Sequence, residues 1–206
     1  MVLLELLFPK RCPVCDKVMA MGEMICPPCA DKLTEVGTPY CQKCGKPIED
    51  LRQEYCGDCM ENIHFYGKGR AVYEYSCIRQ SLYRFKYKGR YEYARFYGEE
   101  IVRVLGTVIK SWKPDALVPV PLHRTRKHMR GYNQAEAIAN VVGNLLKIPV
   151  NTTLVKRVKK TAPQKLLNRG MRQNNLKKAF KIYRNDVKLN TIIIVDDIYT
   201  TGSTID

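Results

Sequence analysis

Apolar residues in the second part of the chain occur in short continuous runs and at helical steps. The runs lie at residues 115–122 and 192–195, and the second is wholly β-branched. Runs of this kind are typical of parallel strands that are buried on both faces. Residues 70–75 alternate enough to predict another strand, and residues 147–158 predict a strand or a strand-like connection.

Helical periodicity is found between these runs. Residues 76–110 predict two helices hinged at Gly89, and apolar residues of the second helix recur at three- and four-residue steps. Residues 135–147 predict a third helix, with Asn133 as its N-cap and Glu136 completing a capping box.

A polar and very basic segment, residues 123–134, joins the strand at 115–122 to the third helix, and it is predicted to be a loop. Strands and helices therefore alternate along the chain. This order predicts an α/β fold of the doubly wound type, with a parallel sheet.

Two adjacent carboxylates, Asp196 and Asp197, end the last apolar run. In open α/β sheets, ligands bind at the carboxyl ends of the strands. Carboxylates accept hydrogen bonds from hydroxyl groups or hold a metal ion, and small hydroxyl-rich loops donate to phosphate. The residues of such a loop follow directly: Thr200, Thr201, Gly202, Ser203 and Thr204. A phosphorylated sugar is a ligand that uses both features.

Two other interpretations apply to the acidic pair. In P-loop NTPases an acidic residue after a strand holds magnesium, but those proteins need the string G-x-x-x-x-G-K-[ST], which this sequence lacks. An ordinary strand followed by a polar turn is the remaining alternative.

Eight of the nine cysteines form four C-x-x-C pairs, separated by 10, 11 and 11 residues. A C-x-x-C turn brings two sulfurs to one ion, so four pairs predict two Cys₄ zinc sites. Gly45 supplies the permissive backbone that a tight turn needs. The predicted ligands are Cys12, Cys15, Cys26, Cys29, Cys41, Cys44, Cys56 and Cys59.

A disulfide framework and an iron–sulfur cluster are the alternatives to zinc. Disulfides are out of place in a chain that shows no secretory signal, so we favour structural zinc. The near-equal gaps fit a sequential pairing as well as a cross-brace. Sequential pairing closes shorter loops and costs less entropy.

The positive charge of the chain is concentrated in its second part. Residues 1–60 hold 7 Lys/Arg and 9 Asp/Glu, whereas residues 61–206 hold 28 and 11. Such a field favours an anionic partner, either nucleic acid or a phosphorylated metabolite, over a merely solvated surface. The basic segment at 123–134 is the strongest local case for anion binding.

No segment approaches the ~20 consecutive apolar residues of a membrane-spanning helix. Residues 1–12 are interrupted by Glu5 and Pro9 and lack a leading positive charge, so they are not expected to be a signal peptide. We therefore expect a cytoplasmic protein without a membrane span.

An ordered set of motifs resembles the ComF family, whose members are phosphoribosyltransferase-like competence proteins. After the cysteine pairs the motifs are F-K-Y-K-G (85–89), V-P-V-P-L-H (118–123), R-G-Y-N-Q-A (130–135), Q-K-L-L-N-R to N-L-K-K-A-F (164–180) and I-I-I-V-D-D-I-Y-T-T-G-S-T (192–204). The resemblance covers nearly the whole chain. It implies a type I phosphoribosyltransferase-like parallel sheet at residues 63–206, preceded by a double zinc-ribbon module at residues 1–62.

The resemblance also implies a site for phosphoribosyl pyrophosphate (PRPP) with magnesium. Asp196 and Asp197 would be the catalytic pair on the ribose hydroxyls, and residues 200–204 would hold the 5′-phosphate. Cations of a hood loop at 160–172 would stabilise the departing pyrophosphate. Further residues implied to bind PRPP are Val118, Pro119, Val120, Pro121, Arg124 and Arg130.

Type I transferases continue past this loop with a helix and further sheet, whereas this sequence ends at Asp206. We therefore expect the C-terminus to be incomplete. No nucleobase-recognition signature is present, and whether the chain is a phosphoribosyltransferase enzyme is left open.

A binding role is the alternative function. The family resemblance points to DNA uptake in natural transformation, with single-stranded DNA and proteins of the competence machinery, such as a helicase, as partners. Residues 79–98 interleave cations with aromatic rings, a pattern that can track phosphates and stack on bases. The predicted DNA-binding cations are Arg84, Lys86, Lys88 and Arg90.

Overall fold

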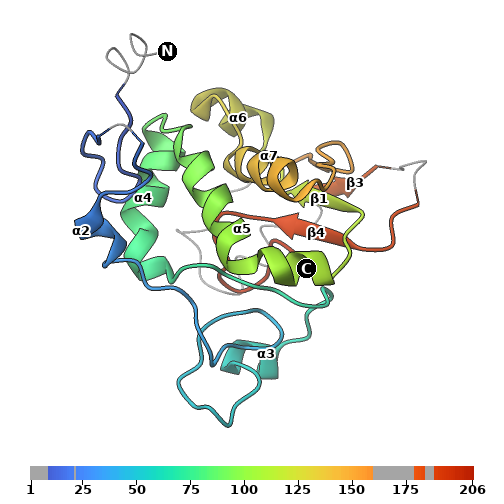
Figure 1. The fold of residues 1–206 in the computed structure, drawn as a ribbon. Helices are drawn as coiled ribbons and strands as arrows, with labels where there is room; N and C mark the ends of the chain where they lie inside the picture. Colours follow the sequence, from blue (N-terminus) through green and yellow to red (C-terminus); the bar gives the residue numbers. More distant parts are fainter. Residues whose placement is uncertain (1–8, 21, 160–178, 184–187) are drawn as a thin grey trace.

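The computed structural model describes residues 9–20, 22–159, 179–183 and 188–206. Its fold is mixed α/β, with a small parallel sheet and a Cys-rich module at the amino-terminal side (Figure 1). In chain order the elements are α2 (Pro27–Ala30), α3 (Gly57–Glu61), α4 (Tyr75–Tyr87), α5 (Tyr93–Ser111), β1 (Ala116–Pro119), α6 (Arg124–Arg130), α7 (Gln134–Leu146), β2 (Val155–Arg157), β3 (Phe180–Ile182) and β4 (Ile192–Val195).

The two helices predicted between residues 76 and 110 are confirmed as α4 and α5. They are separated at Gly89, whose φ of +66° is a left-handed conformation that glycine adopts without strain. The strand predicted at residues 70–75 is wrong. Tyr73 makes only an isolated bridge to Glu35, and α4 begins at Tyr75.

The parallel sheet pairs β1 with β4, in the register Ala116 with Ile192 and Pro119 with Val195. On the other side of β1, Leu117 bridges Val150 in parallel, so β1 has neighbours on both sides. Helix α7 packs on β1 and β4, and α5 packs along α7 (Figure 1). Both strands run in the same direction, so their carboxyl ends meet at one edge of the sheet.

Strand β4 does not have the burial that its sequence predicts. All four residues of β1 are buried, but Ile192 and Ile194 of β4 are 37% and 38% exposed. Among the described strands β4 pairs with β1 on one side, and its alternate residues, Ile193 and Val195, face the core. A β-branched run therefore marked the strand correctly but overstated how well the strand is covered.

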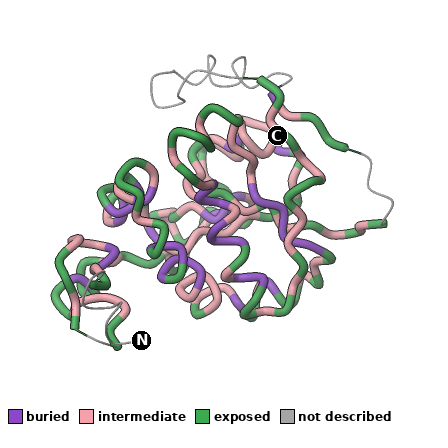
Figure 2. Tube along the Cα trace, turned by 90° about the horizontal axis from the view of Figure 1, so that it is seen from above, coloured by how far each residue is buried: buried purple, intermediate pink, exposed green. Residues whose placement is uncertain are grey.

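The core lies where α4, α5 and α7 meet β1, and buried positions gather there (purple in Figure 2). Phe85 and Leu117 are fully buried within it. Asn133 is the N-cap of α7, as predicted, and its side chain accepts a hydrogen bond from the N–H of Ala135. The carboxylate of Glu136 lies 3.0 Å from Lys127 Nζ.

The basic segment predicted as a loop contains a helix, α6. His123 caps it by accepting a hydrogen bond from Thr125, and Gly131 ends it with a φ of +80°. Charge alone does not oppose a helix, because Lys and Arg have good helix propensity. Only the flanking residues 120–123 and 131–133 are without regular structure.

The hood segment predicted at residues 160–172, most of the motif at 164–180, and residues 1–8 lie outside the described residues. No helix in the described ranges has both the length and the apolar content needed to cross a membrane. The short antiparallel pair of β2 and β3 flanks the undescribed segment.

Candidate metal and ligand sites

The eight paired cysteines gather in two clusters of four. The first holds Cys12, Cys15, Cys26 and Cys29, and the second holds Cys41, Cys44, Cys56 and Cys59. Within each cluster the sulfur atoms all lie within 4.8 Å of one another. The pairing is therefore sequential, and the cross-brace alternative is wrong.

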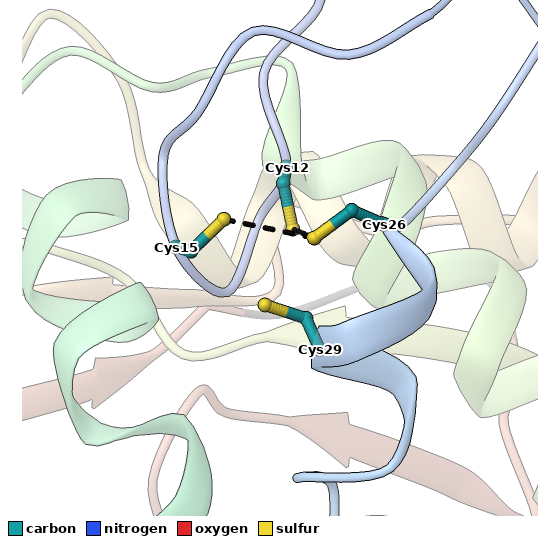
Figure 3. Close-up of side chains that lie close together, drawn as sticks. All are labelled: Cys12, Cys15, Cys26 and Cys29. Carbon is teal, nitrogen blue, oxygen red and sulfur yellow. Dashed lines mark hydrogen bonds between the residues drawn. The ribbon is translucent and has the colours of Figure 1, made fainter.

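In each cluster one cysteine pair lies in a loop and the other pair starts a short helix. Cys26 is the N-cap residue of α2 and Cys29 lies inside that helix (Figure 3). Cys56 and Cys59 hold the same positions at α3. The two clusters are thus structural repeats, and we name them by their modules, the first ribbon (residues 9–33) and the second ribbon (residues 39–61).

The sulfur spacing fits tetrahedral zinc. The Sγ of Cys26 lies 3.6 Å from that of Cys12 and 3.7 Å from that of Cys15 (Figure 3), and Cys44 and Cys56 are 3.6 Å apart. Four sulfurs at about 2.3 Å from zinc are about 3.8 Å apart. All nine thiols are free, and these spacings are much longer than the ~2.05 Å of a disulfide.

In each cluster the surroundings of the first cysteine favour its ionised form, the thiolate. Burial opposes ionisation of Cys41, but the N–H groups of Cys44, Cys56 and Lys43 outweigh it and lower its pKa to about 6. The same balance lowers the pKa of Cys12 to about 7. Burial and the neighbouring sulfurs raise the pKa of Cys29 to about 12, a cost that a bound cation offsets. Both clusters fit a structural zinc ion with four thiolate ligands.

The first ribbon is attached to the junction between α4 and α5. The carboxylate of Asp16 lies 2.8 Å from Arg90 Nε and accepts a hydrogen bond of 2.5 Å from the hydroxyl of Tyr93. Arg84 donates to the carbonyl of Val14 at 2.8 Å. Two of the four predicted DNA-binding cations therefore hold the first ribbon in place.

The predicted acidic pair lies at the carboxyl edge of the parallel sheet. Val120, just beyond β1, donates its N–H to the carbonyl of Val195, so the V-P-V-P-L-H segment and Asp196 are adjacent. Lys86 Nζ lies 2.9 Å from Asp197 Oδ1, and both side chains are mostly buried. Residues from three predicted motifs thus come together at this edge.

The two carboxylates differ in their electrostatic setting. Asp196 reaches solvent, yet the surrounding protein and the negative charge of Asp197 raise its pKa to about 7. The cations of Lys86 and Arg157 oppose this shift. A carboxyl group with a pKa near 7 can exchange a proton or bind a metal ion within the physiological pH range.

Two half-buried arginines line the same region. Arg126 of α6 has its pKa lowered by burial and by the charge of Arg130. Arg157 of β2 has its pKa lowered to about 10 by burial and by the charge of Arg126, with Asp196 acting in the opposite direction. Two arginines whose positive charges repel each other favour the binding of an anion between them.

The two predicted anion-binding arginines of α6, Arg124 and Arg130, differ in exposure. Arg124 is exposed. Arg130 is half-buried, donates to Gln134 Oε1 at 2.9 Å and lies 4.8 Å from the ring centre of Tyr87. Arg124 is thus exposed, whereas Arg126, Arg130 and Arg157 are half-buried.

The hydroxyl-rich loop forms a tight turn after the acidic pair. Gly202 is buried with a φ of +78°, and its carbonyl accepts from the N–H groups of Ile205 and Asp206. The hydroxyls of Thr201 and Ser203 lie 2.7 Å apart, whereas Thr200 is exposed. The loop thus presents several donors next to the carboxylates.

The aromatic residues of the 79–98 segment divide into two groups. Core rings, 6% exposed or less, are Phe85, Tyr93, Phe96 and Tyr97. Exposed rings are Tyr83, Tyr87 and Tyr91, at 48%, 49% and 55%. We call this second group the tyrosine strip. Of the predicted cations in this segment, Lys88 is exposed, whereas Lys86 belongs to the acidic edge.

Comparisons with known proteins find a matching zinc-ribbon model and several similar proteins. A family model described as a double zinc ribbon domain matches residues 3–60. Competence protein F of Haemophilus influenzae is 35% identical over 133 residues, which are 60% of this chain and 56% of that protein. Competence protein ComFC of Bacillus subtilis is 29% identical over 140 residues, which are 67% of this chain and 55% of that protein.

A third relative, the DNA utilization protein YhgH of Escherichia coli, is 37% identical over 92 residues, which are 45% of this chain and 40% of that protein. Over these stretches the chain is similar to competence proteins of the ComF family. It spans about half the length of these relatives. The stretch matched by the double zinc ribbon model coincides with the two cysteine clusters.

The sequence analysis missed two groups of residues. Arg157 was not singled out, although strand alternation at residues 155–157 places it on the same face as Val155. His64 and Tyr66 were also missed. Both contact the loop after β4 from the segment that follows the second ribbon, and no local pattern in the sequence predicts this contact.

Proposed function

We propose that this protein binds a phosphorylated ribose of the PRPP class, with magnesium, at the carboxyl edge formed by β1 and β4. The observation that supports this most is the convergence of Asp196 and Asp197 with the turn at 200–204 on one sheet edge. Carboxylates suit ribose hydroxyls and the magnesium ion, and the turn suits the 5′-phosphate.

Each part of the site then has a chemical task. The Asp pair orients the sugar, and the segment at 118–121 faces the pyrophosphate. Arg126 and Arg157 supply positive charge where the pyrophosphate gathers negative charge as it leaves. Magnesium would neutralise part of that charge. Transfer of the phosphoribosyl group to an acceptor is the reaction that this arrangement supports.

Calorimetric titration with PRPP and magnesium tests the proposal. We expect binding by the parent protein and its loss when Asp196→Ala and Asp197→Ala are combined. A matched control removes two exposed carboxylates of the ribbons, Asp31→Ala with Glu49→Ala, and should leave affinity unchanged. Absence of binding by the parent, or binding that survives loss of the Asp pair, would refute the site.

We infer a second role from the relatives, which are named for competence and for DNA utilization. The tyrosine strip supports binding of single-stranded DNA in natural transformation. Rings of Tyr83 and Tyr87 lie 5.2 Å apart between centroids, and Arg130 lies over the ring of Tyr87. Exposed rings beside cations are the usual platform for unpaired bases.

In this second role the DNA contact still lies in the 79–98 segment, but on other residues than the predicted cations. The cations Arg84, Lys86 and Arg90 have intramolecular partners, so the exposed rings rather than these cations carry the proposal. Binding should be salt-sensitive and tighter for single strands than for duplex of equal length. Equal affinity for the two forms would contradict it.

A further inference from the structure

The segment that follows the second ribbon lies against the loop after β4. His64 Nδ1 lies 2.7 Å from Asp206 Oδ2, and the N–H of Phe65 donates to the other oxygen of that carboxylate at 3.2 Å. The hydroxyls of Tyr66 and Tyr199 lie 2.6 Å apart. These contacts join residues more than 130 positions apart in the chain.

The two surfaces approach so closely that one position between them must be glycine. A Cβ on Gly202 would lie 2.8 Å from His64 Cε1 and 2.8 Å from the hydroxyl of Tyr199. The positive φ of Gly202 adds a second reason against a side chain there. His64 is only 7% exposed, so the contact is a packed interface and not a surface encounter.

The contact is supported by the metal cluster of the second ribbon. Lys43, between the ligands Cys41 and Cys44, places its Nζ 5.3 Å from the ring centre of Tyr66. Lys46, two residues after Cys44, places its Nζ 5.6 Å from the ring centre of Tyr199 and pairs with Asp58 of α3. The backbone that positions both lysines is the turn that the cluster fixes.

The two ribbons contact different parts of the α/β fold. The first ribbon binds the α4–α5 junction through Asp16. Lys46 of the second ribbon contacts Tyr199, and residues 64–66, which follow that ribbon, contact Tyr199 and Asp206, on the two sides of the turn at 200–204 proposed to hold phosphate. A change in the second cluster therefore acts next to that turn, whereas Asp16 of the first ribbon contacts the α4–α5 junction instead.

We propose that the second ribbon positions the loop after β4, with His64 and Tyr66 as positioning residues, so that metal loading of the second cluster sets the rigidity of residues 199–206. The consequence for ligand affinity rests on the proposed function. The effect on the loop itself does not, because it follows from contacts within the chain.

Hydrogen exchange measured on peptides from residues 198–206 tests the positioning. Tyr66→Phe removes one hydrogen bond while keeping the ring, and we expect exchange to become about 2- to 10-fold faster, the factor that a single hydrogen bond supports. Tyr40→Phe is the matched control, since Tyr40 lies in the second ribbon and its hydroxyl accepts a hydrogen bond from Arg70 instead. Unchanged exchange in Tyr66→Phe, or equal acceleration in both variants, would overturn the proposal.

Metal content and ligand affinity separate this inference from the proposed function. Tyr66→Phe should retain the zinc content of the parent and bind PRPP with magnesium about 2- to 10-fold more weakly. Cys56→Ser should accelerate exchange of the loop further than Cys15→Ser. If the parent binds no PRPP but the exchange results hold, the positioning stands and the ligand assignment fails. If Cys15→Ser accelerates loop exchange as much as Cys56→Ser does, the specific role of the second ribbon is refuted.

Discussion

Lys86 Nζ lies 2.9 Å from Asp197 Oδ1 and joins the last turn of α4 to the acidic pair after β4. The two side chains are 16% and 13% exposed, so the pair is shielded on most sides. Lys86, which lies in the segment predicted to contact DNA, thus pairs with a carboxylate at the sheet edge. Its charge also acts on the neighbouring carboxyl group, Asp196.

The ionisation of Asp196 should be measurable near neutrality. Although Asp196 reaches solvent, desolvation by the surrounding protein and the charge of Asp197 raise its pKa to about 7, and Lys86 limits the rise. Carboxyl carbon NMR should therefore show a titration midpoint near pH 7. Lys86→Met should move this midpoint upward by about one unit, because a nearby cation is lost. A midpoint near 4 in the parent would contradict the electrostatic picture.

The same shift predicts how stability depends on pH. The pKa of Asp196 is raised above the ~3.9 of an unfolded aspartate, so the folded state binds this proton more tightly. The stabilisation of the folded state by this bound proton is fully present below about pH 4 and is lost as pH rises through 7. Asp196→Asn should therefore be more stable than the parent at pH 8 and similar to it near pH 4, as urea denaturation can show. A variant that is less stable at pH 8 would refute the assignment.

Sequential pairing predicts the zinc content of double cysteine variants. The parent should hold two zinc ions per chain by elemental analysis. Cys15→Ser with Cys26→Ser damages only the first cluster and should leave one zinc, whereas Cys15→Ser with Cys44→Ser damages both and should leave none. A cross-brace would give the reverse result. Iron with visible absorbance in the parent would exclude zinc as the native metal.

Attachment of the first ribbon should depend on the carboxylate of Asp16. Burial opposes its ionisation, but hydrogen bonds from Arg90 and Tyr93 outweigh this and hold the pKa below its ordinary value. Asp16→Asn should reduce the free energy of unfolding by about 1–2 kcal/mol at pH 7, from weakened charge-assisted hydrogen bonds.

The pH dependence gives the control for this prediction. Because the folded-state pKa of Asp16 is lowered, its stabilisation is present above the unfolded pKa and lost as pH falls through the folded pKa. Parent and Asp16→Asn should converge in stability at acid pH, once Asp16 is protonated in both the folded and unfolded states. Asp31→Asn, an exposed carboxylate of the same ribbon, should have little effect at either pH. A constant difference between Asp16→Asn and the parent across this range would show that packing, not ionisation, is responsible.

Single-stranded DNA affinity should depend on the tyrosine strip. Tyr83→Ala and Tyr87→Ala should each weaken binding by about 1–3 kcal/mol if each ring stacks on a base. Tyr55→Ala removes a similarly exposed ring on the second ribbon and serves as the control. Fluorescence anisotropy with a labelled oligonucleotide measures all three. Unchanged affinity in both strip variants would place any DNA contact elsewhere, such as α6.

The sequence by itself determined the local features of this protein. The cysteine pairs form their clusters within the ribbons because ligands 11–18 residues apart close short loops at low entropic cost. The hinge at Gly89 and the cap at Asn133 were also predictable, because backbone freedom and capping depend on neighbouring residues alone.

Only the tertiary structure decided which residues of a motif serve packing and which remain accessible. Phe85 and Tyr87 are two positions apart, yet one is fully buried and the other is half exposed, because helix α4 turns only one face to the core. The His64–Asp206 contact spans 142 positions. Contacts between residues so distant depend on how whole elements pack, and the periodicity of the sequence does not predict them.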